Sequence, residues 1–245
     1  MKKTVLILLL LGLTLSFALT VDEILDKSEA NDNFLTSSSI NIEQVYNPDG
    51  TVKVSEMKAY SKNGNEKALM EYTEPKRIQG MKILMLNNGD DIWFYSNRTN
   101  RVRKIASHQK NQSANGSDFS YDDMSMSDNR KDYNYSLTGE EKYEEKDCYK
   151  IEFKAKDEGN TYSRFYVWID KSNFLAVGAE FYDENRILWK KLSVRDIKKL
   201  GKYWTAGEVE MKDVLKDSRT VIKTKEIQFD LELSDDIFTE RGLKR

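Results

Sequence analysis

From about residue 38 onward, apolar and polar residues alternate with a period of two, and short runs of turn-forming residues interrupt the pattern. Such alternation is typical of strands that bury one face. Asn63-Gly64 is a strong hairpin signal, because both residues tolerate a positive φ. Tight turns join strands that are antiparallel neighbours. The chain is therefore predicted to form an antiparallel meander over most of its length.

Thirteen segments carry this strand pattern. They cover residues 40–42, 52–54, 68–72, 81–87, 91–95, 101–105, 133–143, 148–155, 161–170, 175–182, 187–195, 203–213 and 218–231. Helical periodicity is confined to three short segments. An amphipathic helix is expected over 21–28, a second helix over 117–127, and a last turn near 234–239.

The strands separate an apolar face from a charged face. Tyr149, Ile151 and Phe153 share one face of their strand, Val209 and Met211 share one face of another, and charged residues stand between them. Three short helices cannot cover so much apolar sheet. Either the sheet folds on itself into a sandwich or filled barrel, or it curls around a cavity for an apolar guest. The alternation alone leaves both open.

The amino terminus has the features of a secretion signal. Lys2 and Lys3 precede an apolar run over Val5–Leu15, and Ser16-Phe17-Ala18 provides small residues at the cleavage positions. The run is too short for a permanent membrane span. We predict a signal peptide over 1–18, cleaved near Ala18. No cysteine stands at the predicted cleavage point, so we expect no lipobox, and the mature protein is expected in the periplasm.

Composition argues against several functional classes. A net charge of −2 with 33% charged residues gives no basic surface for nucleic acid. One histidine, His108, and one cysteine, Cys148, are too few for a metal cluster. Ser117 lacks the frame of a nucleophile elbow. No linker divides residues 19–245, so we expect a single domain, monomeric, without a cofactor and without enzymatic activity.

A basic cluster is the clearest candidate for a specific contact. It consists of Arg98, Arg101, Arg103 and Lys104, close in sequence to Trp93 and Tyr95. Cations beside aromatic rings can hold a lipid headgroup or an anionic partner. A solvent-facing hairpin with ordinary charges explains the same pattern, and this alternative stays open.

Residues 72–124 resemble a known family. The resemblance rests on Tyr72, Pro75 and Gly80, then Trp93 and Tyr95, then Arg101–Ile105, and finally the Gly-Ser-Asp-Phe-Ser-Tyr-Asp-Asp run over Gly116–Asp123. This succession is similar to the LolA-like outer-membrane lipoprotein-sorting proteins, and more narrowly to a branch related to a treponemal uncharacterised protein. The chain departs from that branch at Ser96–Thr99, where Leu-Pro-Ala commonly follows the hairpin.

The resemblance implies a mainly β fold: one strongly curved antiparallel sheet, an incomplete barrel, with a few short helices covering its concave face. It also implies a periplasmic carrier that ferries lipoprotein or lipid acyl chains toward the outer membrane. An inner-membrane exporter of the RND or ABC type and an outer-membrane acceptor would be its partners. The alternative is a regulatory module on the same scaffold that senses mislocalised lipoprotein and contacts a membrane partner.

Within this framework we assign roles to individual residues. The candidates for an acyl-chain cavity are Trp93, Tyr95, Tyr149, Ile151, Phe153, Val209 and Met211. The basic cluster is the candidate for headgroup or partner contact. The family-signature loop contains Gly116, Ser117, Asp118, Phe119, Tyr121 and Asp122, and is expected to be a structural loop or the edge of a lid.

Overall fold

The computed structural model describes residues 19–125 and 129–245, and this part of the chain is mainly β. The main sheet has 13 strands. They are β1 (Thr36–Tyr46), β2 (Val52–Lys62), β3 (Lys67–Glu74), β4 (Lys82–Leu86), β5 (Asp91–Ser96), β6 (Arg101–Lys104), β7 (Tyr133–Tyr143), β8 (Lys146–Ala155), β9 (Arg164–Asp170), β10 (Ala176–Tyr182), β11 (Leu188–Arg195), β14 (Glu208–Asp213) and β15 (Ser218–Phe229). The signal peptide predicted over 1–18 lies outside the described residues.

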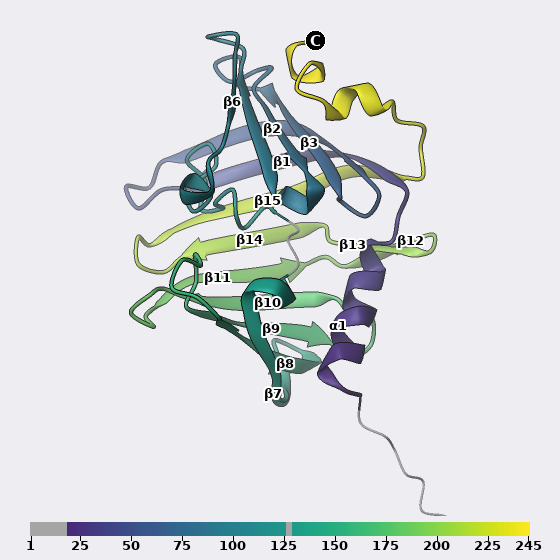
Figure 1. The fold of residues 1–245 in the computed structure, drawn as a ribbon, viewed down its shortest axis with the longest axis vertical. Helices are drawn as coiled ribbons and strands as arrows, with labels where there is room; N and C mark the ends of the chain where they lie inside the picture. Colours follow the sequence, from purple (N-terminus) through teal and green to yellow (C-terminus); the bar gives the residue numbers. More distant parts are fainter. Residues whose placement is uncertain (1–18, 126–128) are drawn as a thin grey trace, which may run out of the picture.

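The sheet is an open, curved antiparallel sheet, as the resemblance implied. Its strand order is β6-β5-β4-β3-β2-β1-β15-β14-β11-β10-β9-β8-β7, so β6 and β7 are the two edges and do not pair. Bulges interrupt the register, for example between Glu56 and Met57 and between Leu137 and Gly139, and bulges increase the local bend of a sheet. Figure 1 shows the two halves of the sheet curving around one open side.

Each predicted strand overlaps a strand of the structure, but the segment over 203–213 is two strands. Its first part is β13 (Tyr203–Thr205), which pairs with β12 (Lys198–Leu200) in a separate two-stranded sheet. Gly207 donates its N–H to the Asp196 carbonyl at 3.0 Å, and a Cβ there would lie 2.7 Å from the Asp196 side chain. This close crossing takes the β12–β13 hairpin out of the main sheet.

The first predicted helix is confirmed as α1 (Val21–Glu29), which begins with a capping box between Thr20 and Glu23. Its Ile24 and Leu25 are buried, as the amphipathic pattern required. A second helix, α2 (Asn129–Asp132), was not predicted. The helix predicted over 117–127 is absent from its described part: residues 117–125 form turns held by serine and aspartate hydrogen bonds, and the remainder lies outside the described residues.

The remaining helical segments are single turns. They are η1 (Ala30–Asp32), η2 (Asn87–Gly89), η3 (Ser107–Gln109), η4 (Asp235–Phe238) and η5 (Gly242–Lys244). The turn predicted near 234–239 is η4, and it packs Phe238 with Leu69 and Leu84 of β3 and β4. Ile83 and Met85 alternate with Leu84 along β4, so they point to the opposite face of the sheet, and they belong to a different core cluster. The C-terminal turns therefore cover the convex face of the sheet.

Candidate functional site

The concave face of β7–β10 carries an aromatic and aliphatic cluster. Its buried members are Ile24, Leu25, Tyr133, Ile151, Phe153, Tyr162, Phe165 and Ile169. The rings of Phe153 and Phe165 stack with their centroids 4.6 Å apart. Both residues belong to the alternating inward positions of adjacent strands, where Phe153 pairs with Phe165 in register. Strand alternation in the sequence thus produces an apolar wall.

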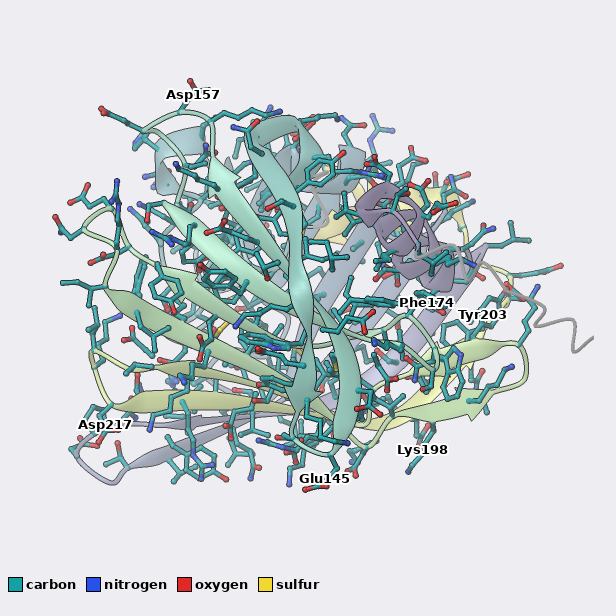
Figure 2. All side chains as sticks on the ribbon, turned by 90° about the horizontal axis from the view of Figure 1, so that it is seen from below. Glu145, Asp157, Phe174, Lys198, Tyr203 and Asp217 are labelled. Atoms are coloured by element: carbon teal, nitrogen blue, oxygen red, sulfur yellow. The ribbon has the colours of Figure 1, made fainter. Side chains whose placement is uncertain are left out.

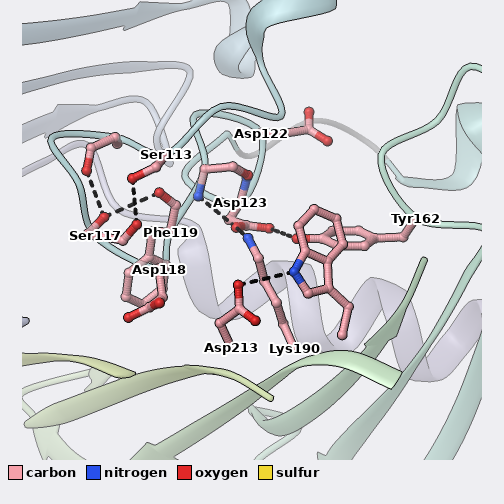
Figure 3. A network of polar contacts seen from close by, with 12 residues as sticks. Ser113, Ser117, Asp118, Phe119, Asp122, Asp123, Tyr162, Lys190 and Asp213 are labelled. Carbon is pink, nitrogen blue, oxygen red and sulfur yellow. Dashed lines mark hydrogen bonds and ion pairs between the residues drawn. The ribbon is translucent and has the colours of Figure 1, made fainter. Parts of the chain in front are cut away.

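The segment between β6 and α2 crosses this concave side, and we call its described residues 106–125 the inner loop (Figure 3). Its Asp118 is 8% exposed and is tied to β15. The hydroxyls of Ser218 and Thr220 donate to the Asp118 carboxylate, and the Asp118 N–H donates to the Thr220 oxygen at 2.8 Å. These three bonds hold the middle of the inner loop against the centre of the sheet.

A second tie lies five residues further along the inner loop. Lys190 of β11 donates to the Asp123 carboxylate at 2.7 Å, and the two side chains are only 4% and 2% exposed. The Tyr162 hydroxyl and the Ser120 N–H also donate to Asp123. Burial and the neighbouring carboxylate raise the pKa of Tyr162, so its hydroxyl stays protonated as a donor. Three donors therefore compensate the buried charge of Asp123.

Two cavities lie beside these ties. One has a volume of about 230 Å³ and lies between the inner loop and β9–β11, where Phe119, Phe181 and Leu192 contribute to its lining. The other has a volume of about 490 Å³ and lies under α1, with Leu25 and Ile169 in its lining. Phe165, Val167 and Ala176 line both cavities, so the two spaces adjoin. Their volumes fall in or near the range of roughly 300–1,000 Å³ for ligand pockets.

The other half of the concave face holds a buried acid. Glu43 of β1 is 4% exposed, and the Tyr72 hydroxyl lies 3.5 Å from its carboxylate. Burial raises the pKa of Glu43 to about 7. Around this pair lies a second apolar cluster, which includes Met57, Ile83 and Tyr121. Side chains of this cluster occupy much of this half, and a pocket of about 180 Å³ lies beside Glu43.

The structure brings together five of the seven acyl-chain candidates. Tyr149, Ile151 and Phe153 face the concave side from β8, and they belong to or pack on its aromatic cluster. Val209 and Met211 of β14 pair with Ile222 and Thr220, which share that face, and Met211 lines the smaller cavity.

Trp93 and Tyr95 do not join these residues. They pack on the convex face with Leu84, under the C-terminal turns. The concave positions of β5 are instead Ile92 and Phe94. An isolated Trp-x-Tyr pattern does not reveal which of the two alternating sets points inward, because both sets in β5 are apolar.

The basic cluster divides between the two faces of β6. Arg103 lies over the Phe94 ring at 5.0 Å, on the concave side, whereas Lys104 lies over Trp93 at 5.6 Å and pairs with Asp91. Arg98 and Arg101 are exposed near the hairpin turn. The four cations therefore do not converge on one point.

The family-signature loop is largely internal. Ser117, Asp118, Phe119 and Tyr121 are buried, Asp122 is half-buried, and Gly116 has a φ of +76° at a turn.

Sequence reasoning missed Phe165 and Phe181, although the same alternation rule finds them. It also missed the Asp123–Lys190 pair. The sequence around Lys190 does not show that an acidic side chain lies opposite it in the folded protein.

The described ranges contain no cluster of His, Cys, Asp or Glu able to hold a metal ion. Within those same ranges, no helix has the length and apolarity needed to cross a membrane.

The chain is similar to known proteins in sequence and in fold. The model of a family described as an uncharacterized protein matches residues 64–245. No curated protein matches the chain. Three solved structures share its fold over most of both chains.

An outer membrane lipoprotein-sorting protein domain from Vibrio parahaemolyticus is 26% identical, with a TM-score of 0.85 over 91% of this chain and 97% of that one. A DUF1329 family protein from Desulfovibrio piger is 29% identical, with a TM-score of 0.83 over 90% and 96%. A LolA superfamily protein from Nitrosomonas europaea is 23% identical, with a TM-score of 0.74 over 92% and 100%. Sequence motif, family match and fold agree, and the chain belongs to the LolA-like outer-membrane lipoprotein-sorting family.

Proposed function

We propose that this protein is a periplasmic carrier that binds the acyl chains of a lipid or lipoprotein on its concave face. The observation that carries the proposal is the pair of adjoining cavities lined by Phe165, Val167 and Ala176. The lipoprotein-sorting protein domain from Vibrio parahaemolyticus, which shares the fold, supports the same class of cargo. Burial of each methylene contributes about 0.8 kcal/mol, so even part of one acyl chain gives useful affinity.

The inner loop sets how cargo enters. It lies at the centre of the concave face, and its Phe119 lines the smaller cavity. An acyl chain that extends beyond the two cavities would displace part of the loop. The Asp118 and Asp123 ties set the cost of that displacement, because opening transfers their carboxylates from fixed donors to water. Four further points stay predictions: transport toward the outer membrane, the single-domain organisation over 19–245, the monomeric state and the exporter partners.

The test is lipid binding by the mature protein, residues 19–245. We expect co-purified lipid in extracts examined by mass spectrometry, and saturable binding of a fluorescent fatty acid. Ala176→Trp should weaken probe binding at least tenfold, because Ala176 is exposed and lines both cavities. The matched control is Ala106→Trp at an exposed position of the inner loop that lines neither cavity. Clean extracts together with no saturable binding would rule out the carrier.

A second pair of variants tests whether the binding site lies on the concave face. Phe153→Asp places a charge on the apolar wall where Phe153 lines the larger cavity, and should weaken probe binding more than Arg103→Ala does. The reverse order would move the site to the basic hairpin. Circular dichroism confirms that each variant is folded before binding is compared.

A further inference from the structure

The β12–β13 hairpin, residues 198–205, has a composition unlike the rest of the surface. Its sequence is Lys-Lys-Leu-Gly-Lys-Tyr-Trp-Thr, with three lysines and no acid. Leu200, at the tip, is 47% exposed. The next residue, Gly201, has a φ of +62°, and a Cβ built there would meet no atom within 4 Å. The tip therefore projects into open space.

The hairpin is held firmly at its base. The Tyr203 ring packs against Phe229 with centroids 4.6 Å apart, and against Phe34 at 6.3 Å. The Tyr203 hydroxyl donates to the Asp230 carboxylate at 2.7 Å. One face of the hairpin is thus anchored, while the lysines and Leu200 are presented to solvent. A fixed platform loses little conformational entropy when it meets a surface.

The charge of the hairpin is only partly balanced. Lys202 lies 3.5 Å from Asp230, and Lys199 lies over the Trp204 ring at 5.5 Å. Within the described parts of the chain, Lys198 and Lys199 have no ion pair. Two acids of α1, Asp26 and Glu29, both pair with Arg130.

We propose that the β12–β13 hairpin docks on an anionic bilayer surface. Lysines near such a surface are attracted by its negative potential, tryptophan favours the headgroup level, and Leu200 provides an apolar tip for the interface. One apolar residue and a few cations give weak, reversible adsorption. This inference goes beyond the binding of acyl chains, because it concerns where the protein meets the membrane.

The position of the hairpin relates it to the larger cavity. β13 contacts η1, and Asp32 of η1 lines the cavity under α1. Figure 2 shows Lys198 and Tyr203 at the same end of the molecule as Phe174, away from Asp157 and Asp217 at the other end. A bilayer docked on the hairpin therefore lies beside the side of the half-barrel where α1 covers the cavity.

The experiment is co-sedimentation of the mature protein with unilamellar vesicles. Vesicles of phosphatidylglycerol and phosphatidylethanolamine should bind wild type in low-salt buffer, phosphatidylcholine vesicles should bind it weakly, and added salt should reduce binding. Removing two lysine charges should weaken the partition of the protein onto anionic vesicles about 30-fold. The double variant Lys198→Glu/Lys199→Glu should reduce this partition by at least the same factor. Leu200→Ser should weaken binding without any change of charge.

The matched control is Lys53→Glu/Lys58→Glu, which makes the same change of charge at two exposed lysines of β2. It should bind vesicles like wild type. Ala176→Trp should also bind vesicles normally, so failure of the cavity proposal and failure of this one are distinguishable. Docking through the hairpin is overturned if wild type ignores anionic vesicles, if the hairpin double variant still binds, or if the β2 control loses as much.

Discussion

The buried Lys190–Asp123 pair offers the most direct test of how the inner loop is held. At 2.7 Å, two unit charges attract each other by about 6 kcal/mol at an effective dielectric constant of about 20, and desolvation offsets much of this. Removing one partner of a buried pair typically costs roughly 3–5 kcal/mol. Asp123 keeps two donors after Lys190→Met, from Tyr162 and Ser120. We therefore expect a loss near 3 kcal/mol.

The assay is urea denaturation of four proteins: wild type, Lys190→Met, Asp123→Leu and the double variant. If the two residues interact as the structure shows, the double variant should lose about 2 kcal/mol less than the sum of the single losses. Lys191→Met is the control, because Lys191 pairs with Glu180 at the surface, where its side chain is 46% exposed, and should cost under about 1 kcal/mol. Additive losses within about 0.5 kcal/mol would refute the reasoning.

Two further predictions concern the other buried acids of the concave face. Since burial raises the pKa of Glu43 to about 7, the folded state holds this proton more tightly than the unfolded state. The stabilisation is complete below the unfolded pKa of about 4.3 and is lost as pH rises through 7. In urea titrations, Glu43→Gln should match wild type near pH 4 and exceed it by roughly 3 kcal/mol at pH 8, and a constant difference across this range would contradict the assignment. Asp118→Ala should cost about 2–3 kcal/mol and speed amide exchange over residues 113–121, whereas Asp122→Ala should leave both nearly unchanged; equal effects of the two variants would place the tie elsewhere.

Much of the fold follows from local patterns. Several hairpin turns carry residues that tolerate their backbone, such as Asn63 and Gly64 with φ of 53° and 60°. Most of the long strands show alternation, and α1 shows both its capping box and its apolar stripe. These signals act between residues close in sequence, so they can be read without knowing the rest of the chain.

The alternation also identified the correct face where only one face was apolar. In β8 the inward Ile151 and Phe153 contrast with charged neighbours, and the structure places both on the concave face. In β5 the two sets are Ile92 with Phe94, and Trp93 with Tyr95. Both sets are buried against other parts of the chain or packed on buried clusters, so periodicity could not choose between them.

The sequence by itself therefore determined the antiparallel meander, the leading helix and the family. Only the tertiary structure decided that the inner loop lies inside the half-barrel. That placement depends on Asp118 meeting Ser218 and Thr220, and on Asp123 meeting Lys190, across long separations in sequence. Such contacts form only when the whole sheet has curved around the loop. No local propensity encodes which distant donor a buried carboxylate will find.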